Sequence, residues 1–134
     1  MARVRQRGTA AEIAVGSALR SMGIAYRLNV RSLPGSPDFA NKTKKWAVFV
    51  HGCFWHHHTG CVRATVPKTN ESFWRDKFDT NRRRDARAVR ELRKRGFRVA
   101  VVWECRAGEI DVLRAKLSKV LEASRIVVAE AMNH

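Results

Sequence analysis

Apolar positions repeat with helical spacing near the start of the chain. Thr9 and Glu12 have the spacing of a capping box, which predicts a helix start, and Gly23 is placed to end that helix. Four apolar side chains then fall at i, i+3, i+4 and i+7, on one face: Val15, Ala18, Leu19 and Met22. We expect residues 1–8, which carry three arginines, to form a short basic arm ahead of this amphipathic helix.

Three short segments have the patterns of β-strands. Tyr26, Leu28 and Val30 alternate with polar residues, which predicts a half-buried strand. A basic turn at 41–45 leads into the apolar run at 46–50, WAVFV, which predicts a buried strand. The run at 99–103, VAVVW, is apolar throughout and predicts a central strand covered on both faces.

Two further helices are predicted. The first spans 71–95, with Asn70 as its N-cap and Gly96 as its stop, and a break near Thr80 is left open. Its apolar members are Phe73, Trp74, Phe78, Val89 and Leu92. The second spans about 109–123 and places five apolar residues inward: Ile110, Leu113, Leu117, Val120 and Leu121.

A further strand is implied at Pro37-Asp38, ahead of the hairpin turn, which makes the order of elements α-β-β-β-α-β-α, with neither an internal repeat nor a linker. This order predicts a single α/β domain over residues 1–134, with a mixed sheet flanked by helices and a tail at 124–134. No apolar run approaches the 18 or so residues that cross a bilayer, and residues 1–12 lack an apolar signal core. We therefore expect a cytoplasmic, nucleoid-associated protein that does not enter a membrane.

The net charge of the chain indicates what kind of partner it binds. Lys and Arg number 27 against 12 acids, a formal net charge of +15. Such an excess favours a polyanion, and nucleic acid is the leading candidate because aromatic residues are interleaved with the basic ones. Anionic membranes and simple solubility are the alternatives. The three cysteines cannot all pair, which argues against a secreted disulfide framework.

Residues 51–61, HGCFWHHHTGC, hold four of the five histidines and two of the three cysteines. Cys53, His58 and Cys61 have the spacing Cys-x4-His-x2-Cys, and Cys105 follows the later strand. Three thiolates and one imidazole form a closed tetrahedral site typical of structural zinc. His57 could replace His58 as the nitrogen ligand. The alternative is ordinary buried cysteines beside solvent-exposed histidines.

Chemistry would then lie outside a closed zinc site. If zinc takes His58, the remaining histidines, His51, His56 and His57, are candidates for activating water. Phosphodiester hydrolysis also requires a divalent cation held by a carboxylate, for which Asp38 is the best placed acid, unless it only caps a turn. Glu12 is already explained by its capping box. Phe54 and Trp55 either pack into the core or wedge between bases.

These residues together resemble a known family, the very short patch repair (Vsr) DNA mismatch endonucleases. The resemblance rests on HGCFWHHH at 51–58, LPGSPDF at 33–39, Phe73-Trp74 and VWEC at 102–105, and it covers about residues 9–122. It implies a restriction-endonuclease-like fold, a variant of the PD-(D/E)xK core. It also implies an Mg-dependent enzyme that nicks one DNA strand 5′ of the thymine in a T:G mismatch.

The resemblance also implies residue roles. Asp38 would bind magnesium together with the backbone carbonyl of Val50, which stands where threonine is common, and His56 would be the general base. Glu12 and His51 would hydrogen-bond the hydrated metal and the phosphate. The zinc set would be Cys53, His58, Cys61 and Cys105, and the wedge that opens the duplex would be Phe54, Trp55 and Trp74. We expect a protein that binds double-stranded DNA as a monomer, with mismatch-repair proteins as possible partners.

Two other functions remain open on the sequence. One is a nuclease with the same site and another DNA target, of homing or restriction type. The other is a zinc-stabilised DNA-binding module without catalysis. Asp38, His51 and His56 separate these classes, because a pure binder has no need of a carboxylate beside a pair of histidines.

Overall fold

The computed structural model describes residues 9–132, with side chains up to residue 121. Its elements are α1 (Ala10–Ser21), β1 (Arg27–Leu28), β2 (Phe39–Asn41), β3 (Trp46–His51), α2 (Glu71–Lys94), β4 (Arg98–Trp103), a 3-10 turn η1 (Glu104–Arg106) and α3 (Ile110–Met132). The predicted order of helices and strands is confirmed. The predicted arm at 1–8 lies outside the described residues, and residues 124–132, expected as a tail, continue α3.

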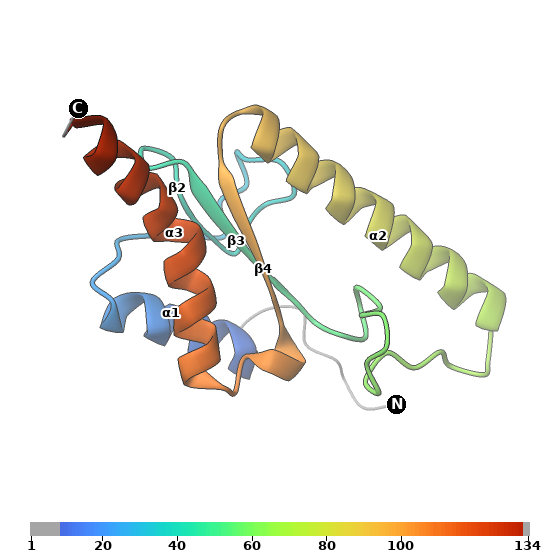
Figure 1. Ribbon diagram of the computed structural model, residues 1–134. Helices are drawn as coiled ribbons and strands as arrows, with labels where there is room; N and C mark the ends of the chain where they lie inside the picture. The colour runs from blue at the N-terminus through green and yellow to red at the C-terminus, as the bar shows by residue number, and fades with distance from the viewer. Residues whose placement is uncertain (1–8, 133–134) are drawn as a thin grey trace.

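The four strands form one sheet in the order β1-β2-β3-β4. The β1–β2 and β2–β3 pairs are antiparallel, and β3–β4 is parallel, so the sheet is mixed as predicted. Helices α1 and α3 cover one face and α2 covers the other (Figure 1). None of the described helices is both long enough and apolar enough to span a bilayer.

The prediction that 99–103 forms a central strand is wrong, because β4 is the outermost strand among the described residues. Both of its faces are nevertheless covered. Ala100 and Val102 pack into the core under α1 and α3, while Val99 and Val101 pack on the α2 side. Coverage by helices on both faces therefore produced the continuous apolar run that looked central.

Helix α1 forms as its sequence predicts. The Glu12 N–H donates to the Thr9 hydroxyl at 3.2 Å, and Gly23 leaves the helix with a φ of +70°, which glycine adopts without strain. Val15 and Leu19 are fully buried on its inner face. The packing of this inner face against the sheet holds the first turn of the helix, which carries Glu12, in place.

The predicted strand at 26–30 is shorter than expected, and Leu28 does not point inward. Only Arg27 and Leu28 pair with β2, and Leu28 is 61% exposed. Asn29 adopts a φ of 47°, in the left-handed region, which ends the extended backbone before Val30 turns into the core. The alternation of apolar and polar residues at 26–30 therefore does not mark one continuous strand, because the backbone bends at Asn29.

Helix α2 is continuous through Thr80, so the open question of a break there is answered. Asn70 stands at the N-cap position, but its φ of 58° leaves its side chain without a capping hydrogen bond. Phe73 is 58% exposed, whereas Phe78 and Leu92 are buried. The predicted apolar face is thus real from Phe78 onward, and the first turn presents aromatic surface to solvent.

Helix α3 packs by Leu113, Leu117 and Leu121, as predicted. Ile110 is an exception, at 43% exposure, because the helix meets the core only from Leu113 onward. On the opposite side of the sheet, the loop before β2 approaches α2 closely at Gly35, where an added Cβ would lie 2.5 Å from Ala88 Cβ. That close approach holds the Asp38 loop at the end of the sheet.

Candidate active site and metal centre

The parallel register of β3 and β4 brings the candidate residues together. His51 pairs with Trp103, so the two chains leave the sheet side by side. Cys53 and Cys105 each follow two residues later, which places both thiols at the carboxyl end of the parallel pair. Functional groups of α/β sheets gather at this end because the loops that leave neighbouring strands meet there.

Cys53, His58, Cys61 and Cys105 form a compact cluster whose ligand atoms lie within 4.8 Å of one another. The His58 Nδ1 lies 3.7 Å from Cys53 Sγ and 3.5 Å from Cys105 Sγ. The His58 ring stacks on Trp103 at 4.1 Å, while His57 stacks on Phe78 at 4.4 Å, away from the thiols. Of the two histidines left open by the sequence, His58 is the one that joins the cluster.

The chemistry of this donor set fits a cation. Burial raises the pKa of the Cys53 thiol to about 12, so a neutral thiol is favoured there unless positive charge is supplied. A metal ion bound to three sulfurs and an imidazole supplies that charge and holds the thiolates together. The four residues could therefore hold a metal ion, as the sequence predicted for this set.

The loop that carries the cluster is fixed by polar contacts from outside it. The Cys53 N–H donates to Glu104 Oε1 at 2.9 Å, which ties the loop to the end of β4. From α2, Asn81 Nδ2 donates to the Trp55 carbonyl and Arg82 donates to the His57 carbonyl, both at 2.9 Å. A loop rich in histidine and glycine is thus held in place without an apolar core of its own.

Asp38 lies at the start of β2 and accepts a hydrogen bond from the Val50 N–H at 2.7 Å. It lines a cavity of about 430 Å³ together with Glu12, Val50, His51 and His56, hereafter the active-site cavity. Burial raises the pKa of Asp38 to about 6, and nearby Glu12 adds to the rise, while the Val50 N–H opposes it. A half-buried carboxylate beside a second acid is an environment in which a divalent cation is stabilised.

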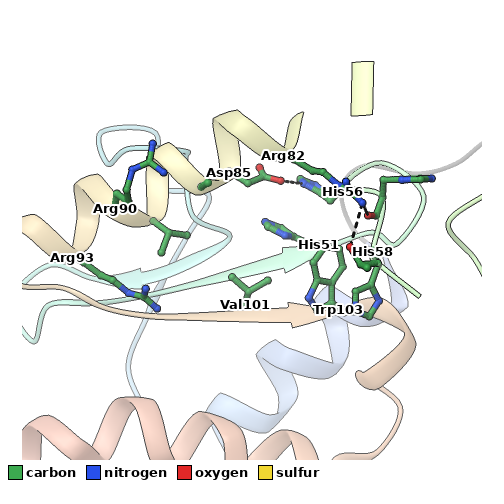
Figure 2. Close-up of a pocket in the computed structure, with 13 residues that line it drawn as sticks. His51, His56, His58, Arg82, Asp85, Arg90, Arg93, Val101 and Trp103 are labelled. Atoms are coloured by element: carbon green, nitrogen blue, oxygen red, sulfur yellow. Dashed lines mark hydrogen bonds and ion pairs between the residues drawn. The ribbon is translucent and has the colours of Figure 1, made fainter. Parts of the chain in front are cut away.

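His56 is held by a residue that the sequence analysis did not single out. Its Nδ1 lies 2.6 Å from Asp85 Oδ2, a carboxylate on α2, as Figure 2 shows. In the sequence, Asp85 is one of a few acids within a strongly basic helix. A signal was present, because Asp85 lies seven residues from both Phe78 and Leu92, on the stripe that faces the core.

His51 stacks face to face on His56, with ring centroids 3.9 Å apart and planes 2° from parallel. It is 6% exposed, and burial, together with neighbouring His56, lowers its pKa to about 4. Its Nδ1 has no hydrogen-bond partner among the described residues. His51 is therefore neutral at pH 7 and keeps one buried ring nitrogen free for a ligand.

His51, His56 and Asp85 also lie close enough together to suggest a second metal cluster. Their geometry argues against it. The nitrogen lone pairs lie in the ring planes, and two parallel rings direct them along parallel lines that do not converge on one ion. His56 Nδ1 is also occupied by Asp85. The three residues are better described as a hydrogen-bonded His–Asp pair with a stacked neutral histidine.

Phe54, Trp55 and Trp74 lie together beside the active-site cavity. Phe54 is 5.3 Å from Trp55 and 5.6 Å from Trp74 between ring centroids, and all three side chains are half-buried. The exposed Phe73 extends the cluster at 5.4 Å from Trp74. The rings pack on one another, and Phe54 packs on Phe78, so these aromatics belong partly to the core, while their open surface leaves the wedge a prediction.

Comparison with known proteins places this arrangement in a family. A family model described as DNA mismatch endonuclease Vsr matches residues 1–63. The Type II nicking enzyme V.XorIIP of Xanthomonas oryzae pv. oryzae is 42% identical over 124 residues, covering 92% of this chain and 90% of that protein. The chain belongs to the Vsr family. Its resemblance to that family, read from the motifs alone, is thereby confirmed.

Two other relatives are similar to most of this chain. The DNA mismatch endonuclease Vsr of Escherichia coli (strain K12) is 43% identical over 105 residues, or 78% of this chain and 67% of that protein. The Type II nicking enzyme V.NmeAIP of Neisseria meningitidis is 36% identical over 121 residues, or 90% of this chain and 86% of that protein. The restriction-endonuclease-like fold class and the prediction of a DNA-cleaving enzyme family are confirmed by this membership.

Proposed function

We propose that this protein is an Mg²⁺-dependent DNA endonuclease that nicks one strand 5′ of the thymine in a T:G mismatch. The observation that carries the proposal is the active-site cavity, in which Asp38, Glu12, His51 and the His56–Asp85 pair line one space. Relatives in the Vsr family bear the names mismatch endonuclease and nicking enzyme. A half-buried carboxylate beside an oriented histidine supports hydrolysis rather than binding alone.

Asp38 is the residue that would hold magnesium, with the backbone carbonyl of Val50 as a second ligand and Glu12 and His51 bonding its waters. The raised pKa of Asp38 supports this assignment, because a nearby cation offsets the cost of burying its negative charge. A divalent ion bound there supplies positive charge to the phosphate oxygens during cleavage. Neutral His51 adds no further charge and is free to orient a phosphate oxygen or a water molecule.

His56 is the proposed general base. The carboxylate of Asp85 accepts a hydrogen bond from the His56 Nδ1–H, which fixes the tautomer and leaves Nε2 as the basic nitrogen. A water molecule next to Nε2 loses its proton to that nitrogen, its oxygen bonds to phosphorus and one ester oxygen leaves. The stacked His51 holds the His56 ring flat, so that its in-plane lone pair keeps a constant direction. The proton assignment is inferred from this hydrogen bond.

The proposed ion for the cysteine cluster is zinc, with Cys53, His58, Cys61 and Cys105 as ligands. Three sulfurs and one nitrogen leave no open position, so this ion is structural. The aromatic cluster of Phe54, Trp55 and Trp74 is the proposed wedge that enters the duplex at the mismatch. We further propose a protein that acts as a monomer on DNA in the cytoplasm, at the nucleoid and alongside mismatch-repair proteins.

A second candidate function keeps the chemistry and changes the target. It is favoured by the names of the relatives from Xanthomonas oryzae and Neisseria meningitidis, which are Type II nicking enzymes. A nuclease of that kind would use the same Asp38 and His56 and would differ in the bases that it recognises. A zinc-stabilised DNA-binding module without catalysis is the third possibility, and the Asp38 cavity disfavours it.

The test is cleavage of a labelled duplex with one T:G mismatch in magnesium, against the same duplex with T:A, and with Asp38→Ala as the inactive control. A single nick 5′ of the mismatched thymine, absent from the control and from T:A, is the expected result. Equal cutting of both duplexes would keep the nuclease and discard the mismatch function. Tight binding without any cutting would leave only the DNA-binding module.

A further inference from the structure

A second cavity, of about 620 Å³, lies between α2 and the outer strand β4. It shares His51, His56 and Asp85 with the active-site cavity but contains neither Asp38 nor Glu12. Figure 2 shows its walls: arginines reach it from α2, while Val101 and Trp103 come from β4. We call it the arginine pocket, after Arg82, Arg90 and Arg93.

The pocket is built by one face of a helix. Arg82, Val89, Arg90 and Arg93 lie at i, i+7, i+8 and i+11 along α2, positions that share a side. Val89, Val101 and Trp103 give the pocket apolar walls, and the arginines give it charge. A cationic cleft with low-dielectric walls concentrates its field on an anion within it.

No carboxylate neutralises these arginines among the described residues. Asp85, the acid that lines the pocket, is bonded to His56, and nearby Glu91 pairs with Lys94 at 3.7 Å. Arg82 donates to the His57 carbonyl and to the Thr59 hydroxyl, neither of which carries charge. Three arginines therefore line one concavity whose carboxylate among the described residues, Asp85, is bonded to His56.

We propose that the arginine pocket binds a backbone phosphate of the DNA strand, next to the phosphate that is cut in the active-site cavity. The two cavities adjoin at the His56–Asp85 pair, which lines both, so a strand that passes this pair would place neighbouring phosphates at the two cavities. Guanidinium groups grip phosphate oxygens through paired N–H donors, and the apolar walls suit the carbon face of deoxyribose. This inference rests on the proposed DNA substrate.

An acidic protein segment is the competing occupant, and the edge of β4 disfavours it. Lys116 of α3 donates a hydrogen bond to the Val101 carbonyl, so this carbonyl on the outer edge of the sheet is already occupied. Lysine at an edge strand is a common device against the addition of another strand. An extended peptide would have to displace that hydrogen bond, whereas a phosphate needs only the side chains above it.

The test compares two double variants of α2 that remove the same charge. Arg90→Gln with Arg93→Gln empties the pocket of two cations, and Arg83→Gln with Arg87→Gln removes two exposed arginines that line neither cavity. Binding to the T:G duplex is measured without magnesium, between about 50 and 200 mM salt. The slope of log Kd against log salt falls by about 0.9 for each phosphate that the protein no longer neutralises.

The expected result is a slope lower by about 0.9 in the Arg90/Arg93 pair, as for the loss of one phosphate contact, and nearly unchanged in the Arg83/Arg87 pair. Ethylation interference at one phosphate beside the nick should disappear only in the pocket variant. An unchanged slope in the pocket variant would overturn the proposal and leave the pocket to an acidic protein. An equal fall in both variants would also overturn it, since the effect would then be net charge. Thermal melting of both variants checks that each remains folded.

The proposed repair function and the proposed phosphate pocket can be refuted independently. If the unmodified protein binds the duplex but does not nick it, and the slopes still differ between the two pairs, the phosphate pocket stands and the proposed catalysis falls. If the unmodified protein nicks beside the mismatch and the slopes agree, only the pocket falls. The two readouts, cleavage and salt slope, keep the outcomes apart.

Discussion

Replacing Asp38 with Asn should stabilise the protein while it abolishes cleavage. Burial is the main cause of the raised pKa of Asp38, so keeping this carboxylate ionised destabilises the folded state. Asparagine has the same shape, keeps an acceptor for the Val50 N–H, and carries no charge to bury. The loss of function follows from the loss of the carboxylate that would hold magnesium.

The magnitude follows from the shift in pKa. Moving the pKa from 3.8 to about 6 corresponds to about 3 kcal/mol of preference for the neutral carboxyl in the folded state, and partial screening by water reduces this to about 2 kcal/mol. For a domain of 134 residues, we expect a rise in Tm of about 6 to 8 °C.

The pH dependence has a definite sign. A carboxyl whose pKa is raised on folding does not destabilise the native protein below the unfolded pKa of 3.8; the destabilisation grows as pH rises from there toward the folded pKa of about 6 and is complete above it. The advantage of Asp38→Asn should therefore be near zero at pH 4 and complete above pH 6. The pH dependence of this gain in stability, rather than the gain alone, would identify the buried charge of Asp38 as its cause.

The assay is thermal melting of both proteins across this pH range without added magnesium, with Asp76→Asn on the exposed face of α2 as the control. A gain that is equal at pH 4 and pH 8, or an Asp38→Asn protein that is less stable at pH 8, would refute the reasoning. Added magnesium should raise the Tm of the unmodified protein and leave that of Asp38→Asn unchanged, because only the former keeps the ligand.

Four further variants test the other parts of the site. Asp85→Asn should lower kcat by about 10²- to 10³-fold without weakening duplex binding, because His56 loses its orienting carboxylate; an unchanged kcat would contradict this role. His58→Asn should lose bound zinc and melt at a lower temperature, whereas His57→Asn should keep both; metal content by mass spectrometry distinguishes them. Trp55→Ala should cost about 1 to 3 kcal/mol of binding to the T:G duplex and little on T:A, measured by fluorescence anisotropy, if this ring stacks on a base.

The sequence predicted that Cys53, His58, Cys61 and Cys105 lie together because most of them are close in the chain and together they use every cysteine. Cys53, His58 and Cys61 lie within nine residues, and Cys105 completes the set with the last cysteine of the chain. The strand that ends just before Cys105 pairs in parallel with the one before Cys53, and parallel strands bring their carboxyl ends together. Spacing and topology therefore pointed to the same four residues.

Helical spacing places Asp85 on the core-facing stripe of α2, but the sequence does not show its partner, because the hydrogen bond to His56 spans 29 positions. Between residues 74 and 98, eleven basic residues stand against four acids, so Asp85 looked like one more charge on a solvated helix. Only the packing of α2 on the sheet turns it toward His56. The same packing selects Arg82, Arg90 and Arg93 from a long basic segment, which the net charge of that segment does not distinguish.

The errors in the predicted strands have a common physical origin. An apolar pattern reports how much of a side chain is buried, not what buries it. Leu28 matched the pattern but lies at an exposed edge, because Asn29 adopts a left-handed backbone and ends β1. The run at 99–103 matched a central strand because helices cover both of its faces, although only one neighbour pairs with it among the strands that the structure describes. Hydrogen-bond pairing leaves no mark on an apolar run.

The metal cluster and the proposed base are joined by a chain of ring contacts. His58 stacks on Trp103 at 4.1 Å, Trp103 meets His51 edge-on at 5.1 Å, and His51 stacks on His56 at 3.9 Å. Because each ring limits the movement of the next, a ligand that fixes His58 also restricts where His56 can lie. A metal ion bound by the Cys/His cluster would therefore also limit the movement of His56, the proposed base. A loop with little core of its own requires an anchor close to the residue whose orientation matters most.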